Sequence, residues 1–273
     1  MTFTRRLNRF FGDSDFYWED AVRVAAEDST DLRREAAISL PDLRREHPEL
    51  IEGGMAHAQH MAARERALIR LLGPTDPPNR ILVPDDPQLM VNWPGGGIHR
   101  WRRQDGVVFM THGMSQPQEP DAVVDEPEKF WSGLGLEYAI RVPDTAEWPI
   151  TVLLHLVRHE LFQNQKAPFS VGATMPTDLG EGITHFFGTY DSQLPHELLL
   201  PGGRCSLVSL VGITSEEFRS LRTIEDRRLG AGVLIRTLRH FGVDAVTTKG
   251  RGSVTEASDF ETVWQNALDS AQS

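Results

Sequence analysis

Two neighbouring segments with different hydrophobic periods constrain the fold more than any other feature of this sequence. Between residues 136 and 142, large apolar side chains alternate with Glu137, Ala139 and Arg141, which is typical of a β-strand with one wetter face. From Pro149 to Gln165, apolar residues recur three and four positions apart, which predicts a helix that buries one stripe. The stripe consists of Ile150, Leu153, Leu154, Val157 and Leu161.

Further segments extend this alternation of strand and helix patterns. Short runs rich in β-branched or aromatic residues predict strands at 80–83, 88–92, 106–111 and 205–213. Capping-box spacings at Thr214 to Glu217 and Ser258 to Glu261 predict two helix starts, and another helix is expected from Glu225 to His240. Because these helices bracket a mostly contiguous set of strands, we expect an α+β domain.

The first 73 residues are expected to form a helical extension in front of that domain. Residues 55–72 contain neither Pro nor Gly, and Gly73 followed by Pro74 supplies a helix stop signal. Three prolines between Pro74 and Pro78 can neither continue a helix nor join a central strand, so they predict a stiff connector. We therefore expect an extension at 1–73 and the α+β domain at 74–273.

The charge balance limits the kind of partner. The chain has 39 acidic and 28 basic residues, and its net charge of −11 disfavours nucleic acid because phosphate contacts need clustered Lys and Arg. A negative field would instead accelerate the approach of a basic protein. No apolar stretch approaches the roughly 18 residues that span a membrane, and no signal-like apolar segment follows Met1 to Arg6. A cytoplasmic location is therefore expected.

Few residues offer reactive chemistry. Cys205 is the only cysteine, which excludes an intramolecular disulfide, and its apolar surroundings predict a buried thiol. The run Gly95–Gly97 beside His99 lacks the Gly-Lys-Thr/Ser of a phosphate loop, so a turn is expected there. Thr111-His-Gly-Met-Ser115 lacks the second glycine of a nucleophile elbow. We predict no catalytic residue and no cofactor.

A pair of histidines supports the alternative hypothesis, a metal-dependent hydrolase. His155 and His159 lie four residues apart on the predicted helix and could ligate a metal together with some of Glu160, His185 and His196. Both imidazoles, however, lie away from the apolar stripe. The glutamate that a zincin motif has between its two histidines is absent here, because Leu156, Val157 and Arg158 occupy those positions. A solvated polar face is the favoured interpretation, with no metal bound.

A run of acidic residues leads directly into two aromatic residues. Five acids and no base occur between Glu119 and Glu128, and Phe130-Trp131 follow. Aromatic anchors inside an acidic rim have the composition of a protein-binding surface. The candidate partner-binding residues are Asp121, Asp125, Glu126, Glu128, Phe130, Trp131 and Glu137.

The order of several short motifs resembles the suppressor of fused domain. Thr111-His-Gly-Met-Ser115 is similar to the turn that ends a strand in that family, and Gly133-Leu-Gly-Leu-Glu137 is similar to its next strand. Trp148-Pro149 opens a helix in the same register, and Thr247-Thr-Lys-Gly-Arg-Gly252 is similar to a late basic turn. The residues to which the resemblance gives a structural role are Thr111, Gly113, Met114, Ser115, Gly133, Gly135 and Glu137.

The resemblance covers about residues 80 to 256 and implies a mixed, largely antiparallel sheet flanked by helices. It further implies a protein-binding domain without enzymatic activity, of the stand-alone bacterial type that neutralises toxins as an immunity protein. The acidic run suggests a basic toxin domain as partner, and the oligomeric state stays open. We expect the strand region from Trp131 to Val142 and its acidic approach to bind that partner, with strand addition at a sheet edge as a possible mode.

Overall fold

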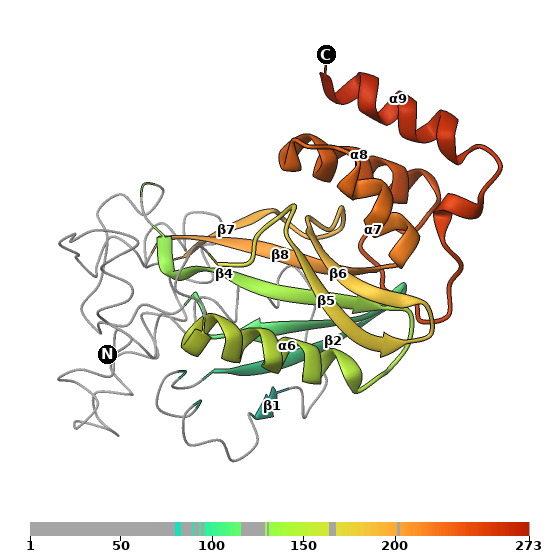
Figure 1. The fold of residues 1–273 in the computed structure, drawn as a ribbon. Helices are drawn as coiled ribbons and strands as arrows, with labels where there is room; N and C mark the ends of the chain where they lie inside the picture. The colour runs from blue at the N-terminus through green and yellow to red at the C-terminus, as the bar shows by residue number, and fades with distance from the viewer. Residues whose placement is uncertain are drawn as a thin grey trace, which may run out of the picture. The chain divides into compact units, whose positions relative to one another are not determined.

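The structure, a computed structural model, describes residues 80–82, 89, 93, 96–115, 129, 131–163, 168–200 and 203–272 (Figure 1). The predicted extension at 1–73, its boundary at 74 and the acidic residues 119–128 lie outside these ranges. The described strands are β1 (Arg80–Leu82), β2 (Gly97–Arg103), β3 (Gly106–His112), β4 (Trp131–Val142), β5 (Thr174–Gly180), β6 (Ile183–Thr189), β7 (Glu197–Leu200) and β8 (Gly203–Ile213). The described α-helices are α6 (Trp148–Arg158), α7 (Ser215–Arg222), α8 (Arg227–His240) and α9 (Phe260–Gln272).

Backbone hydrogen bonds join the eight strands in the order β1-β2-β3-β4-β8-β6-β5, and β7 pairs with β8. The pairs β1–β2, β3–β4, β5–β6, β6–β8 and β7–β8 are antiparallel. The predicted fold class, an α+β domain with a mixed, largely antiparallel sheet flanked by helices, is confirmed.

The chain divides into two compact units. Of the described residues, unit 1 contains 80–82, 89, 93, 96–99, 111–115, 129, 131–137, 197–200 and 203–207, and unit 2 contains 100–110, 138–163, 168–196 and 208–272. The sites below each lie within one unit.

One predicted strand and one predicted turn need correction. Leu89, the one described residue of the predicted strand 88–92, is helical, and the Trp93 amide donates to its carbonyl. His99 lies in β2 and not in a turn, and its side chain is buried against the His112 ring with 4.2 Å between centroids. The hydrophobic pattern did not predict β2, because Arg100, Arg102 and Arg103 interrupt the short run that buries Ile98 and Trp101.

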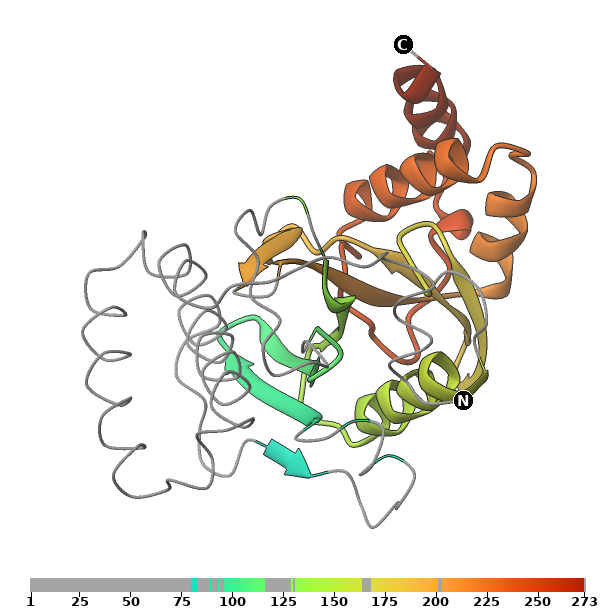
Figure 2. The same cartoon turned by 90° about the vertical axis from the view of Figure 1, so that its left-hand side faces the viewer.

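Helices cover both faces of β6 in unit 2. Phe186 stacks on Trp148 of α6, with 6.0 Å between ring centroids. The next residue, Phe187, joins the apolar core formed with α7, α8 and α9. Successive side chains of a strand point to opposite faces, so α6 and the C-terminal helices lie on opposite sides of β6. Both views show this separation (Figures 1 and 2).

The helices lie where the sequence predicts them, with two differences: α6 is rotated, and α9 begins at Phe260, so that Asp259 and not Ser258 directly precedes it. Thr214 caps α7 through the predicted capping box, in which its hydroxyl accepts from the Glu217 amide and Glu217 accepts from the Thr214 amide. Helix α6 is rotated relative to the predicted stripe, because Val152 and Leu156 are buried whereas Ile150 and Leu154 are only partly buried. The helix ends at Arg158 and continues as a single π-helical turn, His159–Gln163.

Two further predictions concern the burial of Cys205 and membrane-spanning segments. Cys205 is a fully buried thiol, as predicted. Within the described ranges, no helix is both long and apolar enough to cross a lipid bilayer.

Candidate functional site

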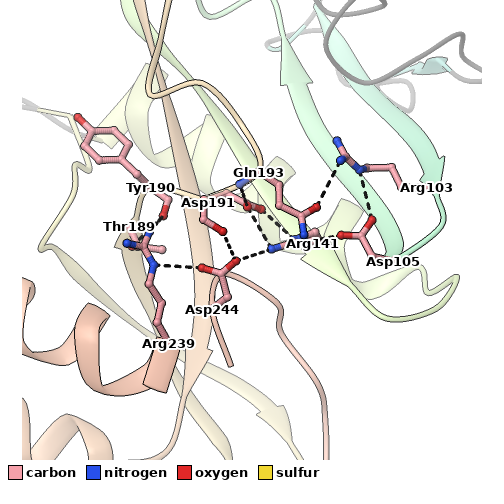
Figure 3. Close-up of polar contacts among 10 residues, drawn as sticks. Arg103, Asp105, Arg141, Thr189, Tyr190, Asp191, Gln193, Arg239 and Asp244 are labelled. Carbon is pink, nitrogen blue, oxygen red and sulfur yellow. Dashed lines mark hydrogen bonds and ion pairs between the residues drawn. The ribbon is translucent and has the colours of Figure 1, made fainter. Parts of the chain in front are cut away.

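Arg141 of β4 is the centre of a charged cluster in unit 2 (Figure 3). Its side chain is 4% exposed and meets three carboxylates. Nη1 lies 2.6 Å from Asp105, Nε lies 2.9 Å from Asp191, and Nη2 lies 2.9 Å from Asp244. The sequence predicts a more solvent-exposed face for this strand, but Arg141 on that face is buried, because ion pairs replace water around its guanidinium.

The three carboxylates come from segments far apart in the sequence. Asp105 lies in the turn between β2 and β3, Asp191 follows β6, and Asp244 follows α8 with a positive φ of 40°. The cluster therefore connects strand β4 to two loops and to the end of a helix. No local sequence pattern could predict it, since its members are separated by 36 to 103 positions from Arg141.

Two more arginines complete the cluster. Arg239 Nε donates to Asp244 at 3.2 Å, and its Nη2 donates to the Tyr190 carbonyl at 3.0 Å. Arg103 pairs with Asp105 at 3.3 Å and donates to the Gln193 side chain. Three guanidinium groups and three carboxylates thus neutralise one another.

The carboxylates differ in pKa because they differ in burial. Burial raises the pKa of Asp191 above its ordinary value, and neither the Gln193 amide nor the charge of Arg141 compensates for it. Burial also acts on Asp105, but a backbone hydrogen bond and Arg141 outweigh it, so its pKa is lowered. The pKa of Asp244 is likewise lowered, because bonds from Ser192 and Arg239 outweigh its desolvation. This arrangement suits a structural junction that holds segments together.

Glu137 of β4 organises the predicted motif in unit 1. Its Oε1 accepts hydrogen bonds from the amides of Gly113 and Ser115, both at 3.0 Å, and from the Ser115 hydroxyl at 2.6 Å. Its Oε2 accepts from the Thr111 hydroxyl at 2.7 Å. The structure thus brings Thr111, Gly113 and Ser115 together around one carboxylate, and Ser115 is held as part of the turn.

The remaining motif residues fix the start of β4. The Leu134 amide donates to the carbonyl of Met114, whose side chain is buried. Gly133 and Gly135 have φ values of 61° and 75°, which favour glycine. A Cβ on Gly135 would lie 3.1 Å from the Trp131 side chain, so this glycine also makes room for the indole.

The predicted partner-binding residues divide between two environments. Glu137 is 0% exposed, so its carboxylate holds the turn and cannot also contact a partner, which corrects that part of the prediction. Trp131 is half-buried, and the guanidinium carbon of Arg204 lies 4.3 Å from its ring centroid. Asp121, Asp125, Glu126, Glu128 and Phe130 lie outside the described residues.

The mode of binding expected for Trp131 to Val142 is also corrected. Strand addition needs an unpaired edge, but β4 lies between β3 and β8 in the strand order. From Ala139 to Val142 its β3 side is already paired in register, so another chain cannot add there.

The histidine pair of the alternative hypothesis lies on the surface. His155 and His159 are both exposed at the end of α6. Glu160 turns inward and accepts from the Tyr138 hydroxyl and the Phe169 amide. His185 stacks on Phe218 and His196 on Tyr190. Among the residues that the structure describes, no three His, Cys, Asp or Glu side chains are grouped as metal ligands.

Sequence reasoning missed one buried ion pair in addition to the Arg141 cluster. Arg251 lies in the late basic turn, and both Nη atoms of its guanidinium pair with Glu217 at the start of α7. Glu217 also accepts from the Val254 amide at 2.9 Å. The capping box identified Glu217 but gave no sign of this second partner.

Comparisons with known proteins agree with this fold. Residues 95–251, more than half of the chain, match the family model described as Suppressor of fused protein (SUFU). No curated protein matches the sequence significantly. A crystal structure of the Sufu–Fu complex is similar with a TM-score of 0.57 and 17% identity, covering 76% of this chain and 96% of that one.

Two other solved structures are also similar. A putative suppressor of fused homologue from Neisseria gonorrhoeae FA 1090 has a TM-score of 0.49 and 16% identity, covering 75% of this chain and all of that one. Drosophila Suppressor of Fused has a TM-score of 0.48 and 18% identity, covering 64% of this chain and 46% of that one. On the evidence of its sequence match and its fold, this chain belongs to the suppressor of fused family.

Proposed function

We propose that this chain acts by binding another protein and does not catalyse a reaction. The observation that supports this most is the family match over residues 95–251. The arrangement of charged side chains agrees with it, because the carboxylates of Asp105, Asp191 and Asp244 are used in ion pairs that hold segments together. The solved Sufu–Fu complex is an example of a family member bound to a protein.

The narrower form of the proposal is an immunity-type role in the cytoplasm, with a basic toxin domain as the partner. Its support is electrostatic. The chain carries a net charge of −11, and five acidic residues between Glu119 and Glu128 directly precede Phe130 and Trp131. A basic domain would approach such a surface faster than a neutral one, and its binding would weaken with salt.

Affinity capture from the native host tests the broad proposal. Purified full-length chain should recover one protein at constant stoichiometry, and recovery should fall as ionic strength rises because complementary charges are screened. Reversing Asp125, Glu126 and Glu128 to lysine should reduce recovery. If recovery and its salt dependence stay the same, this acidic segment is not part of the binding surface.

A growth assay tests the narrower form. Co-expression of the chain with a toxin domain encoded by a neighbouring gene should restore growth of the host cell. Failure of rescue despite a stable complex would contradict immunity while leaving protein binding intact. Turnover of a small substrate that is lost on replacing one histidine would contradict the broad proposal.

A further inference from the structure

One dipeptide at the β2–β3 turn meets two separate requirements of the fold. Asp105 directly precedes β3, and Gly106 is the first residue of that strand. The chain contains no other Asp-Gly sequence and no Asn-Gly sequence. Glycine is required at this place, because its φ is 133° and a Cβ there would collide with the Val142 carbonyl oxygen. The aspartate is required because its carboxylate pairs with Arg141.

An aspartate that is followed by glycine can rearrange without an enzyme. The amide nitrogen of the glycine attacks Cγ of the protonated side-chain carboxyl, so an N–Cγ bond forms, and the carboxyl OH leaves as water with the amide proton. Water then opens this five-membered succinimide at the main-chain carbonyl carbon, whose bond to nitrogen breaks. The product is isoaspartate, in which the main chain runs through Cβ and Cγ. Glycine favours the attack, because it has no Cβ to obstruct the approach.

The surroundings of Asp105 act on this reaction in opposite directions. Its side chain is 38% exposed, so water can reach the turn. The ion pairs oppose the reaction, because Arg141 Nη1 lies 2.6 Å from Oδ2 and Arg103 Nε lies 3.3 Å from Oδ1 (Figure 3). Burial alone would raise the pKa of Asp105, but a backbone hydrogen bond and the charges of Arg141 and Arg103 lower it. The protonated carboxyl that the attack needs is therefore scarce.

The rearrangement would remove one partner from the charged cluster. Isoaspartate has one more atom in the main chain than aspartate, and its free carboxylate is attached to Cα. The negative charge therefore leaves its position beside Arg141. The side chain of Arg141 is only 4% exposed, so the loss of a paired carboxylate there is costly. The modification should weaken the contact between the turn and β4.

We propose that Asp105–Gly106 is a site of spontaneous isoaspartate formation, and that Arg103 and Arg141 limit its rate by holding the carboxylate. The modification loosens the β2–β3 turn as the protein ages. It also makes the aged chain a substrate for an enzyme that methylates isoaspartyl carboxylates. This inference goes beyond the proposed function, because it requires nothing of the binding partner.

Ageing of the purified full-length protein at neutral pH tests the inference. Labelled S-adenosylmethionine and an isoaspartyl methyltransferase quantify the product, and electron-transfer mass spectrometry locates it. Wild type should accumulate isoaspartate at position 105, more slowly than a synthetic peptide with the sequence of residues 101–109. Arg103→Gln should form it severalfold faster than wild type, whereas Arg102→Gln, at the neighbouring exposed site, should not.

Further measurements separate the chemistry from a loss of fold. In Asp105→Glu the label at this position should disappear, because a glutamate would have to close a less favourable six-membered ring. Thermal melts show whether Arg103→Gln keeps its fold. If it does not, the pH dependence of the wild-type rate decides. Because the pKa of Asp105 is lowered, this rate should begin to rise at a lower pH than the rate of the peptide.

Three results would overturn the inference. The first is the absence of isoaspartate at position 105 in both wild type and Arg103→Gln over a period in which the peptide converts. The second is an equal rate in folded Arg103→Gln and in Arg102→Gln, which would show that the ion pair does not limit the reaction. The third is a wild-type pH profile that coincides with that of the peptide.

Discussion

Arg251 forms a bidentate ion pair with Glu217, with both N–O distances at 2.6 Å. Glu217 is fully buried and Arg251 is 11% exposed on the side chain. The pair joins the segment before Val254 to the first turn of α7. A buried carboxylate of this kind depends on its partner, because desolvation of an unpaired charge is costly.

Replacement of Arg251 should therefore destabilise the chain strongly. Arg251→Ala is expected to lower the free energy of unfolding by about 3 kcal/mol, because it leaves the buried Glu217 charge uncompensated. Arg251→Lys should recover only part of the loss, since an ammonium cannot bind both carboxylate oxygens in the same geometry. Urea denaturation measures both. The exposed pair Arg219–Glu216 is the control, and Arg219→Ala should leave stability unchanged within error.

The carboxylate of Glu137 should be indispensable to the turn at Thr111–Ser115. Glu137→Ala removes the acceptor of four hydrogen bonds and should cost about 3 kcal/mol or more. Glu137→Gln keeps the shape and one carbonyl oxygen, so a smaller loss of about 1 to 2 kcal/mol is expected. Chemical denaturation gives the ranking. Equal stability of wild type and Glu137→Ala would show that other groups hold this turn, and Glu197→Ala in the same unit serves as the exposed control.

The Arg141 cluster should make stability depend on pH in two opposite ways. The pKa values of Asp105 and Asp244 are lowered from 3.8, so the unfolded chain takes up their protons first as the pH falls. The stability that these two carboxylates contribute to the folded state is complete above about pH 3.8 and is lost below it. The pKa of Asp191 is raised, so the folded state takes up its proton first and this residue opposes the loss.

Denaturation midpoints measured between about pH 5.5 and 3 distinguish these contributions. The Asp105→Asn variant should lose stability less steeply with falling pH than wild type, because it lacks a carboxyl group whose pKa is lowered in the folded state. Asp191→Asn should lose it more steeply, although it starts from a lower stability because Arg141 loses a buried partner. Identical slopes in all three proteins would contradict the assignment of these shifts to the cluster.

Purified protein should contain much less than one zinc ion per chain. His155 and His159 are exposed, and a third ligand is not grouped with them among the described residues. Elemental analysis by mass spectrometry gives the metal content, and melting with and without EDTA gives its effect on stability. Near-stoichiometric zinc that disappears in the double variant His155→Ala/His159→Ala would revive the hydrolase hypothesis.

Removal of residues 1–73 should leave a folded domain. The prolines from Pro74 to Pro78 are expected to separate the extension from the sheet, so the fragment 74–273 should keep a cooperative thermal transition. Circular dichroism and calorimetry on the full-length and truncated chains test this. Loss of cooperativity in the fragment would mean that part of the extension belongs to the core.

The sequence by itself determined the features that depend on neighbouring residues. The period of 136–142 identified β4, the Thr214–Glu217 spacing identified the cap of α7, and the apolar run around Cys205 identified a buried strand. These features are local, because side-chain periodicity and capping involve residues within a few positions of one another. The order of short motifs was likewise sufficient to identify the family.

The tertiary structure decided what depends on strand order and on distant partners. Interior placement removed β4 as a site of strand addition, and burial changed Glu137 from a candidate surface residue to the acceptor that holds a turn. Arg204 became a neighbour of Trp131 only through the place of β8 beside β4 in the sheet. The carboxylates around Arg141 also come from distant segments. The physical reason is that the free energy of a buried charge depends on what surrounds it in space, which no spacing along the chain records.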